Sequence, residues 1–299
     1  MSSLTLGNRT LAWGECTYVM GILNVTPDSF SGDGLLSSLP SNLRLPGEEG
    51  KTRAALFFAA GADFLDVGGE STRPGAQPVE AEEEMRRVLP VIRAIATEYP
   101  EALISVDTCK AVVAEAALKA GACIVNDVWG LRADPGLAEV AARHKAAVVL
   151  MHNRSTPGNV EMRERLGNAY IGAPYQDLLE DVKHELMESV AIARSAGIPD
   201  ERILLDPGIG FGKTVEQNLE LVNRLGEIRS LGFPVLLGPS RKSFIGYTLN
   251  LPPDQRLEGT AAAVAVGIAR GADIIRVHDV EAMVRVARMT DAIVRRNHR

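Results

Sequence analysis

Eight short apolar runs recur along the chain, and longer stretches with helical spacing separate them. Each run is rich in Val, Ile or Leu and most are nearly continuous, which is typical of parallel strands buried on both faces. The runs are Tyr18–Leu23, Phe64–Val67, Leu103–Val106, Cys123–Val125, Ala147–Leu150, Ile203–Leu205, Val235–Leu237 and Ile274–Val277. Strands alternating with helices in this way predict an α/β fold, a (β/α)₈ TIM barrel; an open doubly wound sheet is the alternative.

Glycines mark the junctions between several of these units. Gly61, Gly121 and Gly271 each stand just before an apolar run. A glycine just past a helix end supplies the left-handed cap that stops the helix. We therefore expect a repeated helix–glycine–strand unit. Thr214 followed by Gln217 predicts a capping box at the start of another helix.

Composition limits both the architecture and the partners. The chain has 299 residues, and barrels of about 250 residues are routinely one domain, so we expect a single domain over 1–299. A net charge of −6 argues against nucleic acid and anionic membrane surfaces as partners. No stretch approaches the ~20 apolar residues of a membrane span. Three cysteines without metal-type spacing make a disulfide framework unexpected and favour a cytoplasmic location.

A polar or charged residue follows every predicted strand. In a barrel these residues converge on one mouth, where the active sites of this fold lie. A role as a helix cap is enough to explain the presence of Asp107 alone. Capping poorly explains why polar residues follow all eight strands. Asp107, Asn126 and Asp206 combine acceptor oxygens with an amide, which suits a flat heterocycle that carries N–H donors, such as an aminopyrimidinone.

A second group of strand-end residues suits an anion. Arg73, Lys242, Arg276 and His278 would concentrate positive charge for a phosphate or diphosphate, with Thr72 beside them. Asn24 and Asp28 offer hard oxygen ligands for Mg²⁺, which commonly binds through few protein groups plus substrate phosphates.

Two other features carry weaker expectations. Residues 207–214 are similar to a phosphate-binding P-loop, but Pro207 stands where the first glycine belongs, so we do not expect a nucleotide there. The acidic run Glu80–Glu84 predicts a solvated helix start.

Six motifs in this chain resemble those of one family, the dihydropteroate synthases among the pterin-binding enzymes. They are MGILNVTPDSFS at 20–31, DVGGESTRPG at 66–75, SVDT at 105–108, DPGIGFGK at 206–213, SRKS at 240–243 and IRVH at 275–278. The resemblance runs from about Thr17 to the C-terminus, which leaves a short N-terminal extension before the first barrel strand. The first two motifs are long and highly specific.

The resemblance implies a reaction and its requirements. Enzymes of this family join 6-hydroxymethyl-7,8-dihydropterin diphosphate to 4-aminobenzoate, releasing diphosphate and forming 7,8-dihydropteroate for folate synthesis. The resemblance also implies the (β/α)₈ fold, dependence on Mg²⁺ and a homodimer through the C-terminal helices. We hypothesise a dissociative substitution, in which Asp107 stabilises a cation at the exocyclic methylene before the aniline nitrogen attacks.

The resemblance further implies roles for individual residues. Asp107, Lys242 and Arg276 would be catalytic, and Asn24 would bind Mg²⁺. The pterin would lie against Asp107, Asn126, Met151, Asp206, Lys242 and Arg276; the diphosphate against Thr72, Arg73, Arg276 and His278; and 4-aminobenzoate against Phe30, Pro74, Ser240 and Lys242. Asn153 and Arg154 depart from the common family pattern, which puts the pocket lining after the fifth strand in question.

Three other functions fit parts of the pattern. A pterin-dependent, corrinoid-linked methyltransferase would share the barrel and the pterin pocket, but the motifs 70–73 and 240–242 and the lack of a corrinoid domain oppose it. A catalytically silent pterin-binding paralogue is disfavoured because every catalytic-type position is filled. A phosphate-binding aldolase would place its Schiff-base lysine on a strand, whereas Lys213 and Lys242 are expected in loops.

Overall fold

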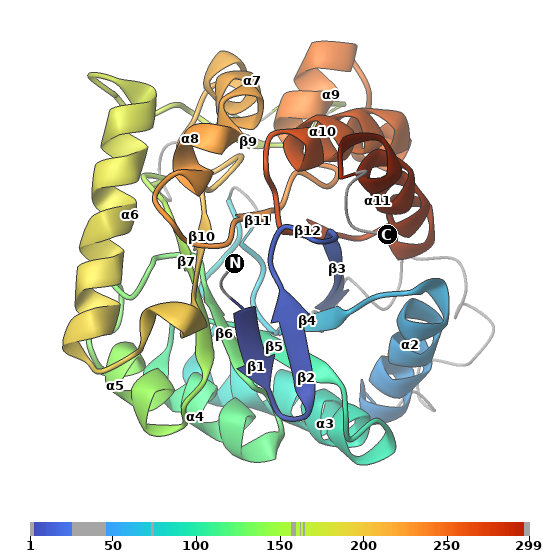
Figure 1. Ribbon diagram of the computed structural model, residues 1–299, viewed down its shortest axis with the longest axis vertical. Coiled ribbons are helices and arrows are strands. Elements are labelled where there is room, and N and C mark those ends of the chain that lie inside the picture. The colour runs from blue at the N-terminus through green and yellow to red at the C-terminus, as the bar shows by residue number, and fades with distance from the viewer. Residues whose placement is uncertain are drawn as a thin grey trace.

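A closed barrel of parallel strands forms the centre of the molecule (Figure 1). The structure, a computed structural model, describes residues 3–25, 46–72, 75–156, 160–161, 163 and 165–295. The barrel strands are β3 (Tyr18–Asn24), β4 (Phe64–Gly68), β5 (Leu103–Asp107), β6 (Ile124–Asp127), β7 (Ala147–Met151), β10 (Ile203–Asp206), β11 (Leu236–Leu237) and β12 (Ile274–Val277). They follow one another in chain order around the sheet, and a parallel bridge from Leu205 to Val235 joins β10 to β11. The predicted (β/α)₈ barrel is confirmed.

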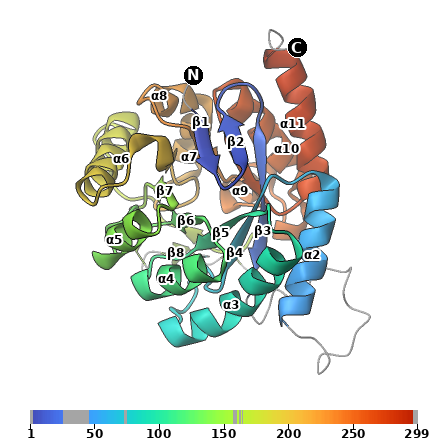
Figure 2. The same ribbon diagram turned by 60° about the horizontal axis from the view of Figure 1, so that its bottom comes forward.

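Helices surround the strands on the outside, as Figures 1 and 2 show from two directions. They are α2 (Pro46–Ala60), α3 (Ala81–Glu98), α4 (Ala111–Ala120), α5 (Gly136–Arg143), α6 (Leu178–Ser195), α7 (Val215–Asn223), α8 (Leu225–Arg229), α9 (Ser243–Leu249), α10 (Leu257–Ala269) and α11 (Val280–Val294), with short 3₁₀ turns η2 (Asp200–Arg202) and η3 (Pro253–Gln255). Apolar residues of strands and helices pack between the two layers in two clusters, the smaller of which joins β3 and β12 to α10 and α11. Among the described residues, no helix is both long and apolar enough to span a membrane.

An N-terminal hairpin closes one end of the barrel. Its strands β1 (Ser3–Leu6) and β2 (Arg9–Ala12) pair antiparallel and lie across the barrel opening in Figure 1. Leu4, Leu11 and Trp13 are buried against the first inward residues of the barrel strands, such as Phe64 and Ile124. The sequence predicted only an extension here. Because this end is filled with apolar side chains, any binding site belongs at the carboxyl ends of the strands.

The predicted caps are confirmed. Gly61, Gly121 and Gly271 have φ of 99°, 121° and 103°, the region that favours glycine. Thr214 and Gln217 form the reciprocal capping box of α7. The expectation of a solvated acidic run at the start of α3 is wrong for Glu84, whose side chain is buried and pairs with Lys110.

Candidate functional site

Alternation along each strand explains why polar groups gather at the barrel mouth. Phe64 and Ile124 face the N-terminal hairpin from inside the barrel, and side chains two residues apart on a strand share a face. Asp66 and Asn126 therefore face the same interior, one layer closer to the mouth. The same rule places Asn24, Asp107, Met151, Asp206 and Arg276 on the inward face at the ends of their strands. The mouth is polar because five of the eight strands end their inward face with a polar residue, namely Asn24, Asp107, Asn126, Asp206 and Arg276.

Arg276 links two carboxylates across this interior. Its Nε donates to Asp66 Oδ2 at 2.6 Å, and its terminal nitrogen donates to Asp107 Oδ2 at 2.6 Å. Asn126 Nδ2 also donates to Asp66 Oδ2, at 3.0 Å. Asp66 is fully buried, so its charge is held by these donors instead of water. Two predicted site residues, Arg276 and Asn126, thus meet at Asp66, which was not among the predicted contacts, and Asp107 joins them through Arg276.

Burial shifts the proton affinities of the charged groups at the mouth. It raises the pKa of Asp107 to about 7, although the Arg276 guanidinium acts in the opposite direction. It also raises the pKa of Asp206, opposed by the nearby Lys242 ammonium. The same burial lowers the pKa of Lys242 to about 8, and the charge of Asp206 counteracts this. Asp107 and Lys242 can therefore change charge near neutral pH.

Lys242 lies where the loop after β11 meets α9. Its Nζ donates to the carbonyl oxygen of Ile209 and lies 4.7 Å from the centroid of the Phe211 ring, within range of a cation–π contact. Phe211 in turn lies 6.1 Å from the Tyr170 ring, with the two rings stacked. The loop after β10 therefore faces the site with an aromatic ring and a carbonyl oxygen.

Ser240 and His278 come together on neighbouring loops. The Ser240 hydroxyl lies 3.0 Å from His278 Nδ1 and accepts a hydrogen bond from the His278 backbone N–H at 3.2 Å. Ser240 is buried, whereas His278 is partly exposed at the mouth. Two residues predicted for different substrates are thus direct neighbours.

A cleft of about 200 Å³ opens beside Asp107. Thr72, Asn153, Tyr170 and Phe211 line it together with Asp107. Of the other predicted contacts, Phe30, Arg73 and Pro74, together with Asp28, lie outside the described residues. The cleft has room for a small aromatic molecule and is bordered by groups that can bind one.

Asn24 is the described residue that could contact a metal ion. It ends β3 on the inward face and pairs with Gly68 of β4 in the sheet. In the described part of the chain, no group of three His, Cys, Asp or Glu side chains forms a protein-only metal site. Mg²⁺ commonly uses one or two protein oxygens with substrate phosphates and water, so Asn24 fits a metal ion that arrives with a diphosphate.

The two residues that depart from the family pattern, Asn153 and Arg154, make several contacts within this chain. Asn153 is buried, donates from Nδ2 to the Val128 carbonyl at 3.0 Å and accepts from the Ser155 N–H at 2.8 Å. Arg154 donates from Nε to Glu185 at 2.6 Å, and its guanidinium lies 4.4 Å from the Tyr175 ring centroid. Both residues brace the loop after β7.

Asp66 and Phe211 are the site residues that the sequence prediction missed. Counting in steps of two from Phe64 places Asp66 on the inward face, so the alternation alone could have found it. Phe211 lies in the motif 206–213, but nothing in an apolar residue within a glycine-rich loop indicates that it faces a cleft. Its place depends on how that loop turns.

Known proteins resemble this chain over nearly its whole length. The profile of the family described as pterin binding enzyme matches residues 20–278. A dihydropteroate synthase of Bacillus subtilis is 50% identical over 95% of this chain and 91% of its own, and one of Clostridium beijerinckii is 47% identical over 98% and 100%. The crystal structure of the Xanthomonas albilineans dihydropteroate synthase with 4-aminobenzoic acid is 40% identical, covers 98% of each chain and has a TM-score of 0.85.

Proposed function

Since the chain belongs to the dihydropteroate synthase family of pterin-binding enzymes, we propose that the residues gathered at its barrel mouth hold the two substrates of that reaction. The enzyme condenses 6-hydroxymethyl-7,8-dihydropterin diphosphate with 4-aminobenzoate to give 7,8-dihydropteroate and diphosphate. The observation that carries the site assignment is the network in which Arg276 joins Asp66 to Asp107, with Asn126 on the same oxygen of Asp66.

The pterin ring lies inside the mouth. Its N–H donors need buried acceptors, and Asp206 and Asp107 supply carboxylate oxygens there. Asn126 adds an amide, Met151 adds an apolar surface at the end of β7, and Lys242 adds a donor opposite the carboxylates. Arg276, held by the carboxylates of Asp66 and Asp107, packs its planar guanidinium near the pterin ring.

The diphosphate lies at the outer rim of the mouth. Thr72, Arg276 and His278 of the described residues supply donors and positive charge, and Arg73 is proposed from the sequence. Asn24 would contact Mg²⁺ carried by the diphosphate. When bound, Mg²⁺ neutralises charge that develops on the departing diphosphate.

The 4-aminobenzoate lies in the cleft beside Asp107. Phe211 lines this cleft and supplies a ring surface, and Lys242 lies against the same ring. Ser240, Phe30 and Pro74 are proposed from the sequence. This arrangement brings the amino nitrogen of the second substrate toward the exocyclic methylene of the first.

The substitution is dissociative. The bond from the methylene carbon to the diphosphate oxygen breaks, and the electron pair leaves with diphosphate. Asp107, as a carboxylate, stabilises the cation left on the dihydropterin. The aniline nitrogen then forms the new C–N bond and releases its proton, so no covalent enzyme intermediate is formed.

Asp107→Asn separates binding from chemistry. The purified variant should still bind the pterin diphosphate, measured by calorimetry, but should form dihydropteroate at least about a hundredfold more slowly than the wild type. Near-normal turnover would refute the role of Asp107.

Removing Mg²⁺ with a chelator should abolish product formation. Asn24→Ala should raise the Mg²⁺ concentration that restores product formation; an unchanged Mg²⁺ requirement would refute the role of Asn24.

A homodimer through the C-terminal helices is supported by apolar residues exposed there. Figures 1 and 2 show α10 and α11 side by side at the outer surface. Val266 on α10 and Met289 and Ile293 on α11 are 43%, 64% and 57% exposed. Burying such a patch favours association. Replacing Met289 and Ile293 with Glu should therefore yield monomers in sedimentation experiments, whereas Val112→Glu on α4 should not.

A cytoplasmic location is supported by the state of the cysteines. Cys16, Cys109 and Cys123 are all free thiols, and burial raises the pKa of Cys109 and Cys123 to about 11. Unpaired cysteines are typical of reducing compartments. Cell fractionation should find the synthase activity in the cytoplasmic fraction; activity in a secreted fraction would refute the location.

A further inference from the structure

Lys213 is a buried lysine at the end of the P-loop-like run, and the proposed chemistry does not use it. Its side chain is 3% exposed. Nζ donates to the carbonyl oxygens of Gly208 at 2.9 Å and Phe211 at 3.0 Å, and it lies 3.0 Å from His152 Nδ1. An ammonium has three donors, and these three acceptors use all of them.

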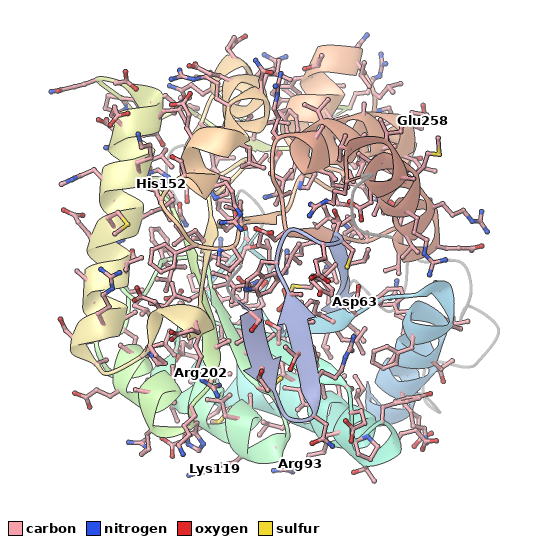
Figure 3. All side chains as sticks on the ribbon, viewed as in Figure 1. Asp63, Arg93, Lys119, His152, Arg202 and Glu258 are labelled. Carbon is pink, nitrogen blue, oxygen red and sulfur yellow. The ribbon has the colours of Figure 1, made fainter. Side chains whose placement is uncertain are left out.

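The contact with Lys213 determines which ring nitrogen of His152 carries the proton. Burial lowers the pKa of Lys213 to about 7, so the side chain is an ammonium below that pH. An ammonium only donates, so His152 Nδ1 then accepts and the ring proton lies on Nε2. That nitrogen lies 3.2 Å from Glu185 Oε2 on α6. Figure 3 shows His152 between α6 and the barrel. Burial lowers the pKa of His152 to about 4, which agrees with a neutral ring at pH 7. A chain of contacts therefore runs from Glu185 through His152 to Lys213.

The Gly208–Phe211 turn wraps around this ammonium. The Phe211 N–H donates to the Gly208 carbonyl at 3.1 Å, which closes the turn. The Gly210 N–H donates to Asn218 Oδ1 at 2.6 Å. Two carbonyls of the turn point to Lys213, while the carbonyl between them, that of Ile209, accepts from Lys242. Lys213 thus lies behind the turn, and Lys242 lies in front of it at the substrate site.

We propose that Lys213 is a positioning residue whose ammonium holds this turn in the shape that places the Phe211 ring and the Ile209 carbonyl against Lys242. Lys213 thereby sets the affinity for 4-aminobenzoate, which rests on the proposed assignment of Phe211 and Lys242 to that substrate. Without the ammonium, the Phe211 carbonyl and His152 Nδ1 would lack a donor, the Gly208 carbonyl would keep only the Phe211 N–H, and the turn would rearrange to satisfy them. The resemblance to a P-loop then has a structural explanation that involves no nucleotide.

The test separates the two substrates. Lys213→Met keeps the length and most of the volume of the side chain but removes every donor. We expect KM for 4-aminobenzoate to rise about tenfold and KM for the pterin diphosphate to change less than about threefold. In a double-mutant cycle, Phe211→Ala should raise the same KM, and adding Lys213→Met should raise it little further, because Lys213 acts through Phe211.

A matched control removes a buried hydrogen-bonded charge at the closed end of the barrel. Asp273 is buried, accepts from the Val235 N–H at 2.9 Å and forms a salt bridge with Arg229 Nε at 2.8 Å. Asp273→Asn should lower the melting temperature and leave both KM values unchanged. If Lys213→Met changes both KM values equally, or neither, Lys213 has no positioning role. If the wild type forms no dihydropteroate, the proposed function fails instead.

A measurement on the wild type covers the case in which Lys213→Met does not fold. In ¹⁵N-histidine NMR at pH 6, where Lys213 is charged and His152 is neutral, His152 should appear as the ring protonated at Nε2, identified by the signals absent from His152→Asn. A ring protonated at Nδ1 could not accept from Lys213 and would overturn the proposal.

Discussion

Asp66 holds two site residues through one of its carboxylate oxygens. Oδ2 accepts from Asn126 at 3.0 Å and from Arg276 at 2.6 Å, inside a fully buried environment. Hydrogen bonds to a buried charge are stronger than those between neutral groups, and losing one leaves its partner unsatisfied. Asp66 therefore positions both Asn126 and Arg276 without lying at the reacting atoms.

The substitution Asp66→Asn tests this role. It keeps the size of the side chain but removes the charge that orients Arg276. We expect KM for the pterin diphosphate to rise about tenfold, equivalent to about 1.4 kcal/mol of binding free energy. Asp63→Asn is the matched control, since Asp63 stands at the opposite end of the same strand and accepts from the Val19 N–H at 2.9 Å. An equal rise of KM in both variants would show a general loss of structure.

The ionisation of Asp107 predicts the acid limb of the pH profile. Burial raises its pKa to about 7, against the opposing charge of Arg276, and the carboxylate is the form that stabilises a cation. We therefore expect kcat/KM for the pterin diphosphate to fall about tenfold per pH unit below pH 7 and to level off between pH 7 and 8, above which Lys242 loses its charge. Asp273→Asn should keep this profile, because Asp273 lies at the closed end of the barrel, where it accepts from the Val235 N–H. A profile that stays flat down to pH 5 would contradict the assignment.

Most of the site residues could be predicted because strand ends can be read from the sequence. Asp107, Asn126, Met151, Asp206 and Arg276 all lie at the mouth as expected. What could not be predicted is which of them touch one another. The bonds of Arg276 to Asp66 and Asp107 span separations of 210 and 169 residues, and only the closure of the barrel brings them together.

At the scale of elements, the loop after β10 is held by close backbone packing. Gly208 has φ of 71°, and a Cβ there would lie 1.8 Å from the His152 carbonyl oxygen. Gly197, after α6, has φ of 89° but no atom within 4 Å of such a Cβ. The two glycines share the left-handed backbone, but the steric clash is confined to Gly208.

Comparing Gly208→Ala with Gly197→Ala isolates that clash. Gly197→Ala should cost about 1–2 kcal/mol of unfolding free energy, since only the backbone conformation is strained. Gly208→Ala should cost more than about 4 kcal/mol or prevent folding, because two backbone segments must separate. Denaturant unfolding measures both values. Similar costs for the two variants would mean that His152 and Gly208 do not approach closely in solution.

The elements themselves were largely predictable, with one exception. The eight strand runs and the capping box at Thr214 follow from local patterns, and the structure contains them. The N-terminal hairpin was not predicted, since Leu4, Leu11 and Trp13 form no strand pattern long enough to recognise. Their burial depends on the barrel opening that they cover, which exists only after the strands have assembled.

At the scale of the whole molecule, the net charge of −6 hides an interior where charges of both signs are buried together. Asp66, Asp107 and Asp206 lie near Lys242 and Arg276 at the mouth, and Lys213 and His152 lie just behind them. Each buried group must keep its charge state without water, so the stability of the entire barrel depends on pH. Asp107 and His152 change the stability in opposite directions as the pH falls, because burial raises the pKa of Asp107 and lowers that of His152.

His152 predicts a loss of stability in acid that one variant can isolate. Burial lowers its pKa from 6.5 to about 4. Between these values the unfolded chain binds a proton that the folded protein does not, so stability is present above pH 6.5 and is lost as the pH falls toward 4. The loss of unfolding free energy amounts to about 3 kcal/mol.

His152→Asn keeps an acceptor for Lys213 but cannot be protonated. Subtracting its unfolding free energies from those of the wild type, measured by denaturant titration, removes the opposing effect of Asp107. The difference should be constant above pH 7, where His152 is neutral in both states, and should decline between pH 6.5 and 4. A constant difference over the whole range would mean that His152 is not held neutral between Glu185 and Lys213.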